Sequence, residues 1–457
     1  MKIRIDKRFI NIISIWSLIL FATISGINFL WVIAFGIFCA ELVFNLHRPD
    51  ELILLQVVYV SIFQYLISYF QAPTLLSYIT DIINIILLIH LILDHKLLGF
   101  INRKRRICIW IFVIVICSLF AYVMYGFNLL LCLWGFRNMY RFLPFMLATI
   151  TYGNKNICKR LFSIVDILLV INLFLVYFQS SIKGYWQDNI GGCFGVAVGT
   201  ANTYLNVYLI VASSIYVSKY IASEVRLKGL LWRMVAFLYI ATVSELKVYY
   251  IELILIFVLT YIFNETNKKK LLRLFANGGL ILIGVSIAIK ILYTIYPTFR
   301  NFYSVSSIYN TAINGYTSSD DIGRLSVIPY VFKKIMNKNS YQLLFGIGIG
   351  NAQYSNVSIL CSNFYSQFWK THYNWFSDAL IVIESGLIGL AAYCLFWLSI
   401  LLDIFKKKKN TDKIAFVISE ILIVLVFLLI IYNTTMNIEC VYFLIPFVLM
   451  AYMYNRI

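Results

Sequence analysis

Charged residues are scarce in this sequence. Only 13% of its 457 residues are Asp, Glu, Lys or Arg, whereas 61% are hydrophobic and the mean hydropathy is +0.85. A soluble domain has about 25% charged residues, so this chain has too few polar side chains to cover a water-exposed globule. Apolar runs such as 9–27, 107–125, 161–178 and 414–431 approach the ~18–20 residues that cross a bilayer. We therefore expect lipid to cover much of the surface.

Several chemical signatures are also missing. The nine cysteines form no C-x-x-C pair, and the three that we expect outside, Cys193, Cys361 and Cys440, are an odd number, so no disulfide framework is predicted. A Cys193–Cys361 bridge and two small buried thiols both fit the pattern. No His/Cys/Asp cluster has metal-ligand spacing. GIGIG at 346–350 follows no βαβ pattern, which favours a turn between two membrane-lying pieces over a nucleotide loop.

Basic residues are the main charged class. Lys and Arg number 38 against 20 Asp and Glu, giving a net charge of +18. They lie in short clusters between apolar runs rather than on a water-exposed basic stripe, which argues against nucleic-acid binding. With the N-terminus in the cytoplasm, 27 of the 38 fall in cytoplasmic segments, as the positive-inside rule requires. The pattern predicts both termini in the cytoplasm and an uncleaved first helix.

Threading the chain in this orientation predicts an all-α integral membrane protein, a single domain over 1–457 with about fourteen transmembrane helices. The expected helices are 9–27, 29–46, 52–71, 74–94, 107–125, 127–150, 161–179, 196–218, 232–243, 247–263, 274–295, 373–402, 414–432 and 441–455. One external segment, 296–372, is long. Within it a helical spacing of apolar residues predicts an amphipathic helix bent at Pro329; these residues are Ile322, Leu325, Ile328, Phe332, Ile335 and Met336.

Arg137 and Arg141, in GFRNMYRFLPF, lie four residues apart on one face of the expected helix. A charge near mid-bilayer costs about 2.5–3.5 kcal/mol on insertion scales, so both need a polar cavity, an anion or an acid. Two guanidinium groups on one face suit a diphosphate. The alternative is ion pairing with intramembrane acids such as Asp81, Asp166 or Glu252.

Two more cations are candidates for ligand binding. Lys247 lies where VSELK (243–247) interrupts an apolar run, and a cation at such a break can meet a ligand. Pairing with Glu245 is the alternative. Arg324 opens the expected loop helix after Asp320 and Asp321. It can bind a phosphate or pair with those two aspartates.

His372 is the only histidine expected on the outer face. Its imidazole suits general-base work or a hydrogen bond to a sugar hydroxyl, although a lone interfacial histidine is more often structural. Asp378 and Glu384 follow in the same expected helix. Either acid could orient the imidazole or pair with an arginine. The tyrosines, serines and asparagines of 296–372 suit stacking and hydrogen bonding to sugars, with packing onto the bundle as the alternative.

These segments together resemble the O-antigen polymerase and ligase superfamily. The resemblance rests on GFRNMYRFLPF, TVSELKVYYIELILI, and above all GRLSVIPYVFKKIMNKNSYQLLFGIGIGN followed by THYNWFSDALIVIESGLIGL. It covers the topology of the whole chain and the motifs from about Gly323 to Leu390. It implies a GT-C-like helical bundle. It also implies a metal-independent, inverting glycosyltransferase, a capsular or O-antigen polysaccharide polymerase of the bacterial inner membrane that uses undecaprenyl-diphosphate-linked oligosaccharides.

Carried over to this sequence, the resemblance implies that Arg137, Arg141 and Arg324 hold the diphosphate. His372 then lies at the acceptor sugar, with Arg324 and His372 as the catalytic pair. Lys247 stands where many relatives have arginine, which keeps the charge but loses the fork. No cofactor is implied; membrane lipid, a flippase and a chain-length regulator are implied as partners. The alternatives are an O-antigen-type ligase and a flippase, and the lack of an internal repeat weighs against the flippase.

Overall fold

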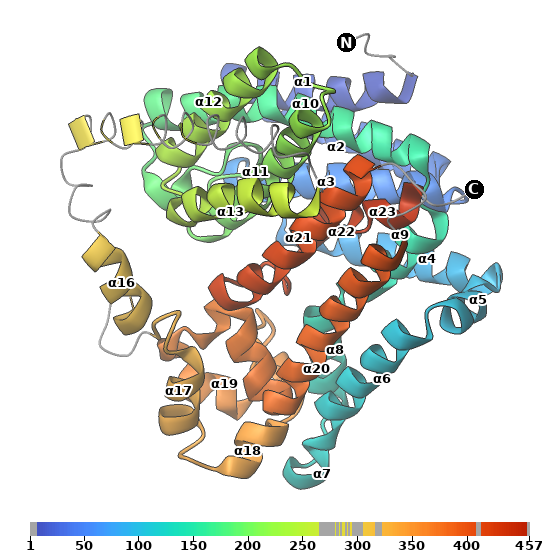
Figure 1. Cartoon of the computed structure of the whole chain (residues 1–457), viewed down its shortest axis with the longest axis vertical. Helices are drawn as coiled ribbons and strands as arrows, with labels where there is room; N and C mark the ends of the chain where they lie inside the picture. The colour runs from blue at the N-terminus through green and yellow to red at the C-terminus, as the bar shows by residue number, and fades with distance from the viewer. Residues whose placement is uncertain are drawn as a thin grey trace.

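The protein is described here from a computed structural model, which covers residues 7–264, 305–315, 322–407 and 413–454 together with isolated positions between 279 and 294. Every regular element in these ranges is helical (Figure 1). The all-α prediction is therefore confirmed for the described part of the chain. Most of the expected helix 274–295 lies outside the described residues, as do Lys2, Arg4 and the basic residues of 268–273.

The helices follow the apolar runs closely. The first half of the chain forms α1 (Lys7–Ser25), α2 (Phe29–Phe44), α3 (Pro49–Tyr69), α4 (Ile79–Leu93), α5 (Lys96–Arg103), α6 (Arg105–Phe120), α7 (Tyr122–Tyr125), α8 (Leu129–Tyr140), α9 (Phe142–Tyr152), α10 (Lys155–Tyr177) and α11 (Thr200–Ile221). The second half forms α12 (Leu227–Val243), α13 (Lys247–Phe263), α16 (Val305–Asn314), α17 (Val327–Tyr330), α18 (Ser340–Phe345), α19 (Asn363–Phe368), α20 (Ser377–Lys407), α21 (Lys413–Tyr432), α22 (Val441–Val448) and α23 (Met450–Tyr454).

Within the part of the chain that the structure describes, five stretches are long and apolar enough to cross a membrane: Pro49–Tyr69, Thr74–Leu93, Lys155–Ile182, Ser377–Lys406 and Lys413–Tyr432. Shorter apolar helices include Phe29–Phe44 and Phe142–Tyr152. Several helices carry large apolar side chains that are more than half exposed, which is costly in water but favourable against lipid tails; examples are Phe112, Val170, Val235 and Ile251. These features indicate a helical membrane protein.

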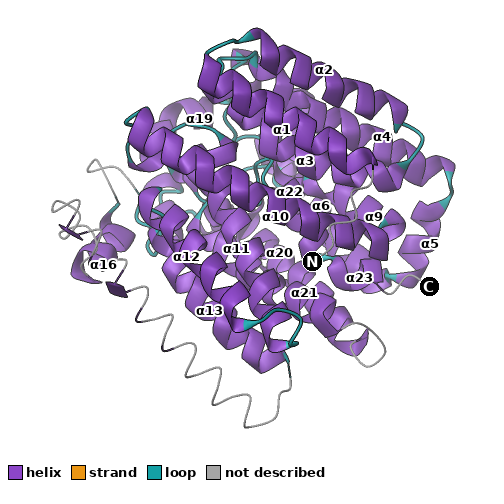
Figure 2. Cartoon of the chain, turned by 90° about the horizontal axis from the view of Figure 1, so that it is seen from above, coloured by secondary structure: helices purple, strands orange, loops and turns teal. Residues whose placement is uncertain are grey.

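The centre of the bundle is built from helices that are apolar on all sides. α3, α11 and α21 bury most of their residues and α22 buries all of them, and Figure 2 shows α11 and α22 in the middle with α2, α5 and α13 towards the periphery. Their largest buried side chains are aromatic, including Tyr59, Tyr208 and Tyr442. Buried aromatic rings provide large contact areas, so this centre forms a firm support for the residues at its ends.

The external segment departs from the sequence prediction. The structure does not show one amphipathic helix bent at Pro329. A short α-helix begins at Val327, continues as a wider π-helical turn over Val331–Ile335, and ends at Met336. Pro329 stands in the first turn, where its missing N–H costs nothing, so it does not bend a longer helix. Leu325, expected on the buried face, is 63% exposed.

A break within α20 fixes the GIGIG segment. Gly386 has a φ of +72°, so the helix is interrupted there. The carbonyls of Ile383 and Glu384 consequently lack their helical partners and instead accept hydrogen bonds from the N–H groups of Ile347 and Gly348 at 2.8 and 3.0 Å. The backbone of the GIGIG segment is therefore hydrogen-bonded to α20 at the break, and we call this contact the wedge. The helices α17, α18 and α19 lie beside it, at the end of the molecule that also holds α7 (Figure 1).

Candidate functional site

The helix that carries the two central arginines is divided. α8 and α9 meet at Arg141, although the sequence predicted one continuous helix. Pro144 explains the division, because it has no N–H to donate to the carbonyl of Tyr140. The carbonyl of Arg141 accepts a hydrogen bond from the side-chain amide of Asn84 on α4 at 3.3 Å. This hydrogen bond holds the backbone of Arg141 against α4.

The guanidinium of Arg137 is held by an acid, an amide and two rings. Its Nε and Nη2 donate to Oδ2 of Asp81 at 3.0 and 2.6 Å, and its Nη1 donates to Oδ1 of Asn138 at 2.9 Å. The rings of Tyr78 and Trp134 have their centroids 5.0 and 4.9 Å from its Cζ, within range of a cation–π interaction. The side chain keeps 23% of its surface exposed, so a small anion can still reach it.

Arg141, in contrast, is enclosed. Its Nη1 pairs with Oε1 of Glu439, which lies between α21 and α22, and its Nη2 donates to Oδ1 of Asn138 at 3.1 Å. Tyr204 of α11 donates its hydroxyl hydrogen to the other Glu439 oxygen at 3.0 Å. The Arg141 side chain is only 4% exposed and that of Glu439 is 13% exposed. This pair is a buried structural unit at the centre of the bundle.

The structure therefore favours ion pairing for both arginines. The expectation that Arg141 lines an open cavity is wrong: its guanidinium faces a carboxylate in an enclosed site. The physical reason is that an unpaired charge in an apolar bundle is far costlier than a paired one. Of the acids considered from the sequence, Asp81 is one of the two partners; Asp166 pairs instead with Arg233 at 3.5 Å. Glu439 was not considered.

Lys247 also pairs with an acid. Its Nζ lies 2.9 Å from Oε1 of Glu245, the partner that the sequence offered as the alternative to a ligand. The break between α12 and α13 is present at the predicted residues. Glu245 turns the chain with a φ of +54°. Lys247 stays 25% exposed, so it remains open to solvent or a ligand while neutralising Glu245.

Arg324 and His372 lie on two segments of the chain that run next to each other. The N–H of Ile322 donates to the carbonyl of Thr371 at 3.3 Å, which lays the two segments side by side. The guanidinium of Arg324 lies over the ring of Tyr432, at the end of α21, with 4.0 Å between Cζ and the ring centroid. The two residues that the sequence predicted as the catalytic pair thus share one end of the bundle.

The His372 imidazole stacks on Trp375. The ring centroids are 4.1 Å apart and the planes are inclined by only 10°. His372 itself has a φ of +54°, in the left-handed region that residues other than glycine adopt only occasionally. The stacking and the unusual backbone fix the direction of the imidazole. The alternative partners of Arg324, Asp320 and Asp321, lie outside the described residues.

The two acids of α20 serve the backbone. Asp378 is buried, and its Oδ1 accepts from the N–H of Ala379 at 2.8 Å. Glu384 is 1% exposed, and its Oε1 accepts from the N–H of Ala352 at 3.2 Å and from the amide of Gln353 at 3.0 Å. Glu384 therefore secures the segment that follows GIGIG. These hydrogen bonds assign it to loop attachment rather than to orienting His372.

One connection joins the two groups of residues. The link between α21 and α22 begins next to Tyr432, beneath Arg324, and contains Glu439, the partner of Arg141. It is tied to the start of α20, because the N–H of Ser377 donates to the carbonyl of Asn433 at 3.0 Å. The sequence analysis did not predict a role for this link. The available signal was Glu439, an acid in a short connection between two apolar runs.

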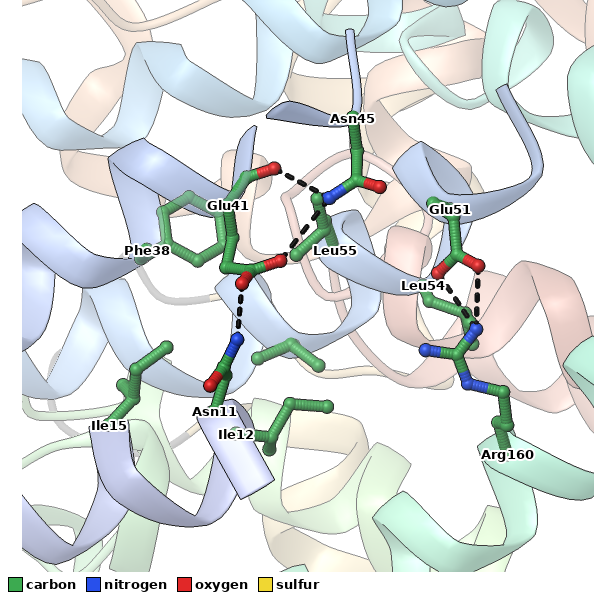
Figure 3. Close-up of a pocket in the computed structure, with 11 residues that line it drawn as sticks. Asn11, Ile12, Ile15, Phe38, Glu41, Asn45, Glu51, Leu54, Leu55 and Arg160 are labelled. Carbon is green, nitrogen blue, oxygen red and sulfur yellow. Dashed lines mark hydrogen bonds and ion pairs between the residues drawn. The ribbon is translucent and has the colours of Figure 1, made fainter. Parts of the chain in front are cut away.

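A small polar pocket lies between α1, α2, α3 and α10 (Figure 3). Nη1 of Arg160 donates to both oxygens of Glu51 at 2.9 and 2.7 Å. Glu41 accepts from the amides of Asn11 and Asn45. The free space is only about 20 Å³, room for a water molecule. Its carboxylates are already bonded, so we assign it to helix packing.

Comparison with protein-family models, with curated proteins and with solved structures finds no match for this chain. Within the described ranges, no group of three or more His, Cys, Asp or Glu side chains is arranged to hold a metal ion. The candidate site consists of Arg137 with its partners, and of Arg324 and His372 on their adjacent segments.

Proposed function

We infer that this protein is a membrane glycosyltransferase that polymerises undecaprenyl-diphosphate-linked oligosaccharides on the outer face of a bacterial inner membrane, with about fourteen membrane crossings. One arrangement supports the proposal. Arg137 pairs with Asp81, the segment of Arg324 lies beside that of His372, and the link between α21 and α22 connects the two groups through Tyr432 and Glu439. Cations together with an imidazole are what transfer from a lipid diphosphate requires.

The reaction assigns a role to each member. The acceptor hydroxyl oxygen bonds to the anomeric carbon of the donor sugar, and the bond from that carbon to the diphosphate oxygen breaks. The diphosphate leaves with the electron pair, and a cation stabilises its negative charge. Arg137 is the first such cation, because it keeps 23% of its surface exposed while Asp81 and Asn138 hold it in position. Arg324 is the second cation, and His372 accepts the hydroxyl proton or orients the hydroxyl.

Arg141 takes a positioning role in this proposal. Its guanidinium and that of Arg137 donate to the same oxygen of Asn138, at 3.1 and 2.9 Å. The buried Arg141–Glu439 pair thus anchors the amide that holds Arg137. Lys247 stays a candidate for lipid or diphosphate contact, since it is a quarter exposed at a helix break. Glu384 supports the loop, whereas Asp378 bonds to the start of its own helix.

The test uses purified protein in lipid nanodiscs, supplied with lipid-linked repeat units. Wild-type protein is expected to form polymer and to release one molecule of undecaprenyl diphosphate for each new glycosidic linkage. Arg137→Gln should lower that rate about 10²-fold or more, whereas Lys183→Gln, which removes an exposed cation elsewhere in the described structure, should leave it unchanged. Wild-type protein that releases no diphosphate and forms no polymer would contradict the proposed function.

A further inference from the structure

The loop segment contains an open groove of about 450 Å³, formed around Ser358–Leu360 and α19. This volume is within the range of small-ligand sites, about 300–1,000 Å³. Its lining combines aromatic rings with short polar side chains; these are Tyr354, Asn356, Ser358, Tyr365, Ser366 and Trp369. None of them has a role in the site described above.

The aromatic rings of the groove are exposed where packing would normally bury them. Tyr354 is 54% exposed and Trp369 is 47% exposed, while Tyr365 is half-buried with its ring centroid 5.7 Å from that of Tyr354. Ser358 and Ser366 are exposed beside them. Lipid tails would favour apolar neighbours over these hydroxyls. A sugar ring suits the mixture, since its C–H face can lie on an aromatic ring while its hydroxyls bond to serine and asparagine.

The groove is held in shape by bonds beneath it. Tyr373 is completely buried, and its hydroxyl donates to the carbonyl of Ala352 at 2.9 Å. Sγ of Cys361 donates to the carbonyl of Ser355 at 3.1 Å and accepts from the N–H of Ser355 at 3.3 Å. Ser362 caps α19 by accepting from the N–H of Tyr365 at 3.0 Å. A preformed surface loses little conformational entropy when a ligand binds.

Trp134 connects the groove to Arg137. The indole N–H of Trp134 donates to the carbonyl of Tyr354 at 3.1 Å. The same indole ring lies against the guanidinium of Arg137, with 4.9 Å between Cζ and the ring centroid. A single tryptophan therefore separates the partly exposed cation from the rim of the groove. A glycan whose diphosphate lies at Arg137 can reach the groove with its next sugar units.

We propose that this groove binds sugar units of the glycan chain and that its grip sets how many repeats are added before the chain is released. The inference rests on the proposed function. Mean chain length reflects the ratio of the addition rate to the release rate. A groove that slows release lengthens the product without taking part in bond formation.

The experiment compares Trp369→Ala and Tyr365→Ala with wild type in a strain from which the gene has been deleted. Polymer length is measured by gel electrophoresis, and protein content by an epitope tag in the membrane fraction. Truncation of a central aromatic side chain commonly makes release about five-fold faster or more, so mean length should fall about five-fold. Trp369→Phe should restore most of it. Trp186→Ala, which removes an exposed tryptophan outside the groove, is the matched control.

The outcomes separate the two proposals. Deletion that leaves polymer intact, or that blocks export instead of polymerisation, overturns the proposed function. If deletion stops polymerisation but both alanine variants give the wild-type length distribution at equal protein content, the function stands and the groove assignment is wrong. Shortening that occurs equally with Trp186→Ala shows a general membrane-anchoring effect of tryptophan and also overturns the assignment.

Discussion

Removing one member of the Arg141–Glu439 pair should destabilise the protein strongly. The two side chains are only 4% and 13% exposed, so the surviving charge would stay buried. Breaking a buried ion pair costs about 3–5 kcal/mol. Loss of Glu439 also deprives the Tyr204 hydroxyl of its acceptor, which adds about 1 kcal/mol or more. The Arg137–Asp81 pair is 23% and 21% exposed, so water can solvate a survivor there and the cost is smaller.

A double-mutant cycle measures the pair directly. Arg141→Met and Glu439→Leu are expected to lower the free energy of unfolding by about 3–5 kcal/mol each. The double variant removes both charges and should lose no more stability than one single variant does, which corresponds to a coupling energy of at least about 3 kcal/mol. The measurement is urea unfolding in mixed micelles, followed by intrinsic fluorescence and extrapolated linearly to zero urea. Arg137→Gln serves as the comparison at the exposed pair.

Two results would refute this reasoning. Single variants that unfold at the wild-type urea concentration would mean that water reaches Arg141 and that the site is open. A double variant that loses the sum of the single effects would mean that the two side chains stabilise the bundle separately. If Arg141→Met keeps its stability but loses glycan transfer, Arg141 belongs with the diphosphate-binding cations after all.

Three further predictions follow from single features. Gly350→Ala should destabilise the fold by at least about 2 kcal/mol, because its φ is +88° and a Cβ would lie 1.8 Å from the carbonyl oxygen of Leu131; thermal unfolding tests this, and unchanged stability contradicts the wedge. His372→Ala should lower transfer about 10²–10⁴-fold with little change in binding of lipid-linked substrate; His372→Gln should keep most activity if the imidazole only positions the sugar, and full activity of the alanine variant excludes both roles. Reporter fusions at Ser358 and Lys408 should report opposite sides of the membrane, with Lys408 inside; the same side for both would refute the threading.

Hydropathy predicted the helices well because apolar length is a local property. The expected segment 247–263 coincides with α13, and 414–432 differs from α21 by one residue. The division of 127–150 into α8 and α9 was not predicted, although Pro144 was the local signal for it. The break at Gly386 had a similar signal, a glycine within an apolar helix.

The amphipathic helix of the outer segment was a less successful prediction, for a physical reason. Apolar residues at helical spacing do not show whether the chain between them remains helical, because tertiary contacts compete with local preference. Here the N–H of Leu325 donates to the carbonyl of Ala312 at 2.8 Å, so the chain before Val327 is held by α16 instead of by its own helix. The buried residues Ile322 and Ile335 nevertheless keep their predicted inward position.

The central charges show what sequence can and cannot determine about a membrane site. A buried arginine in an apolar helix must have a polar partner, and this holds whether the partner is a ligand or a carboxylate. Which of the two it is depends on contacts across the bundle: Arg141 and Glu439 are 298 positions apart. Asp81 was foreseen because it lies within an apolar run, whereas Glu439 lies in a link, where an acid usually faces solvent. Once Glu439 neutralises Arg141, the proposed contact with a diphosphate falls to its neighbour Arg137, which lies one helical turn away and keeps 23% of its surface exposed beside Asp81.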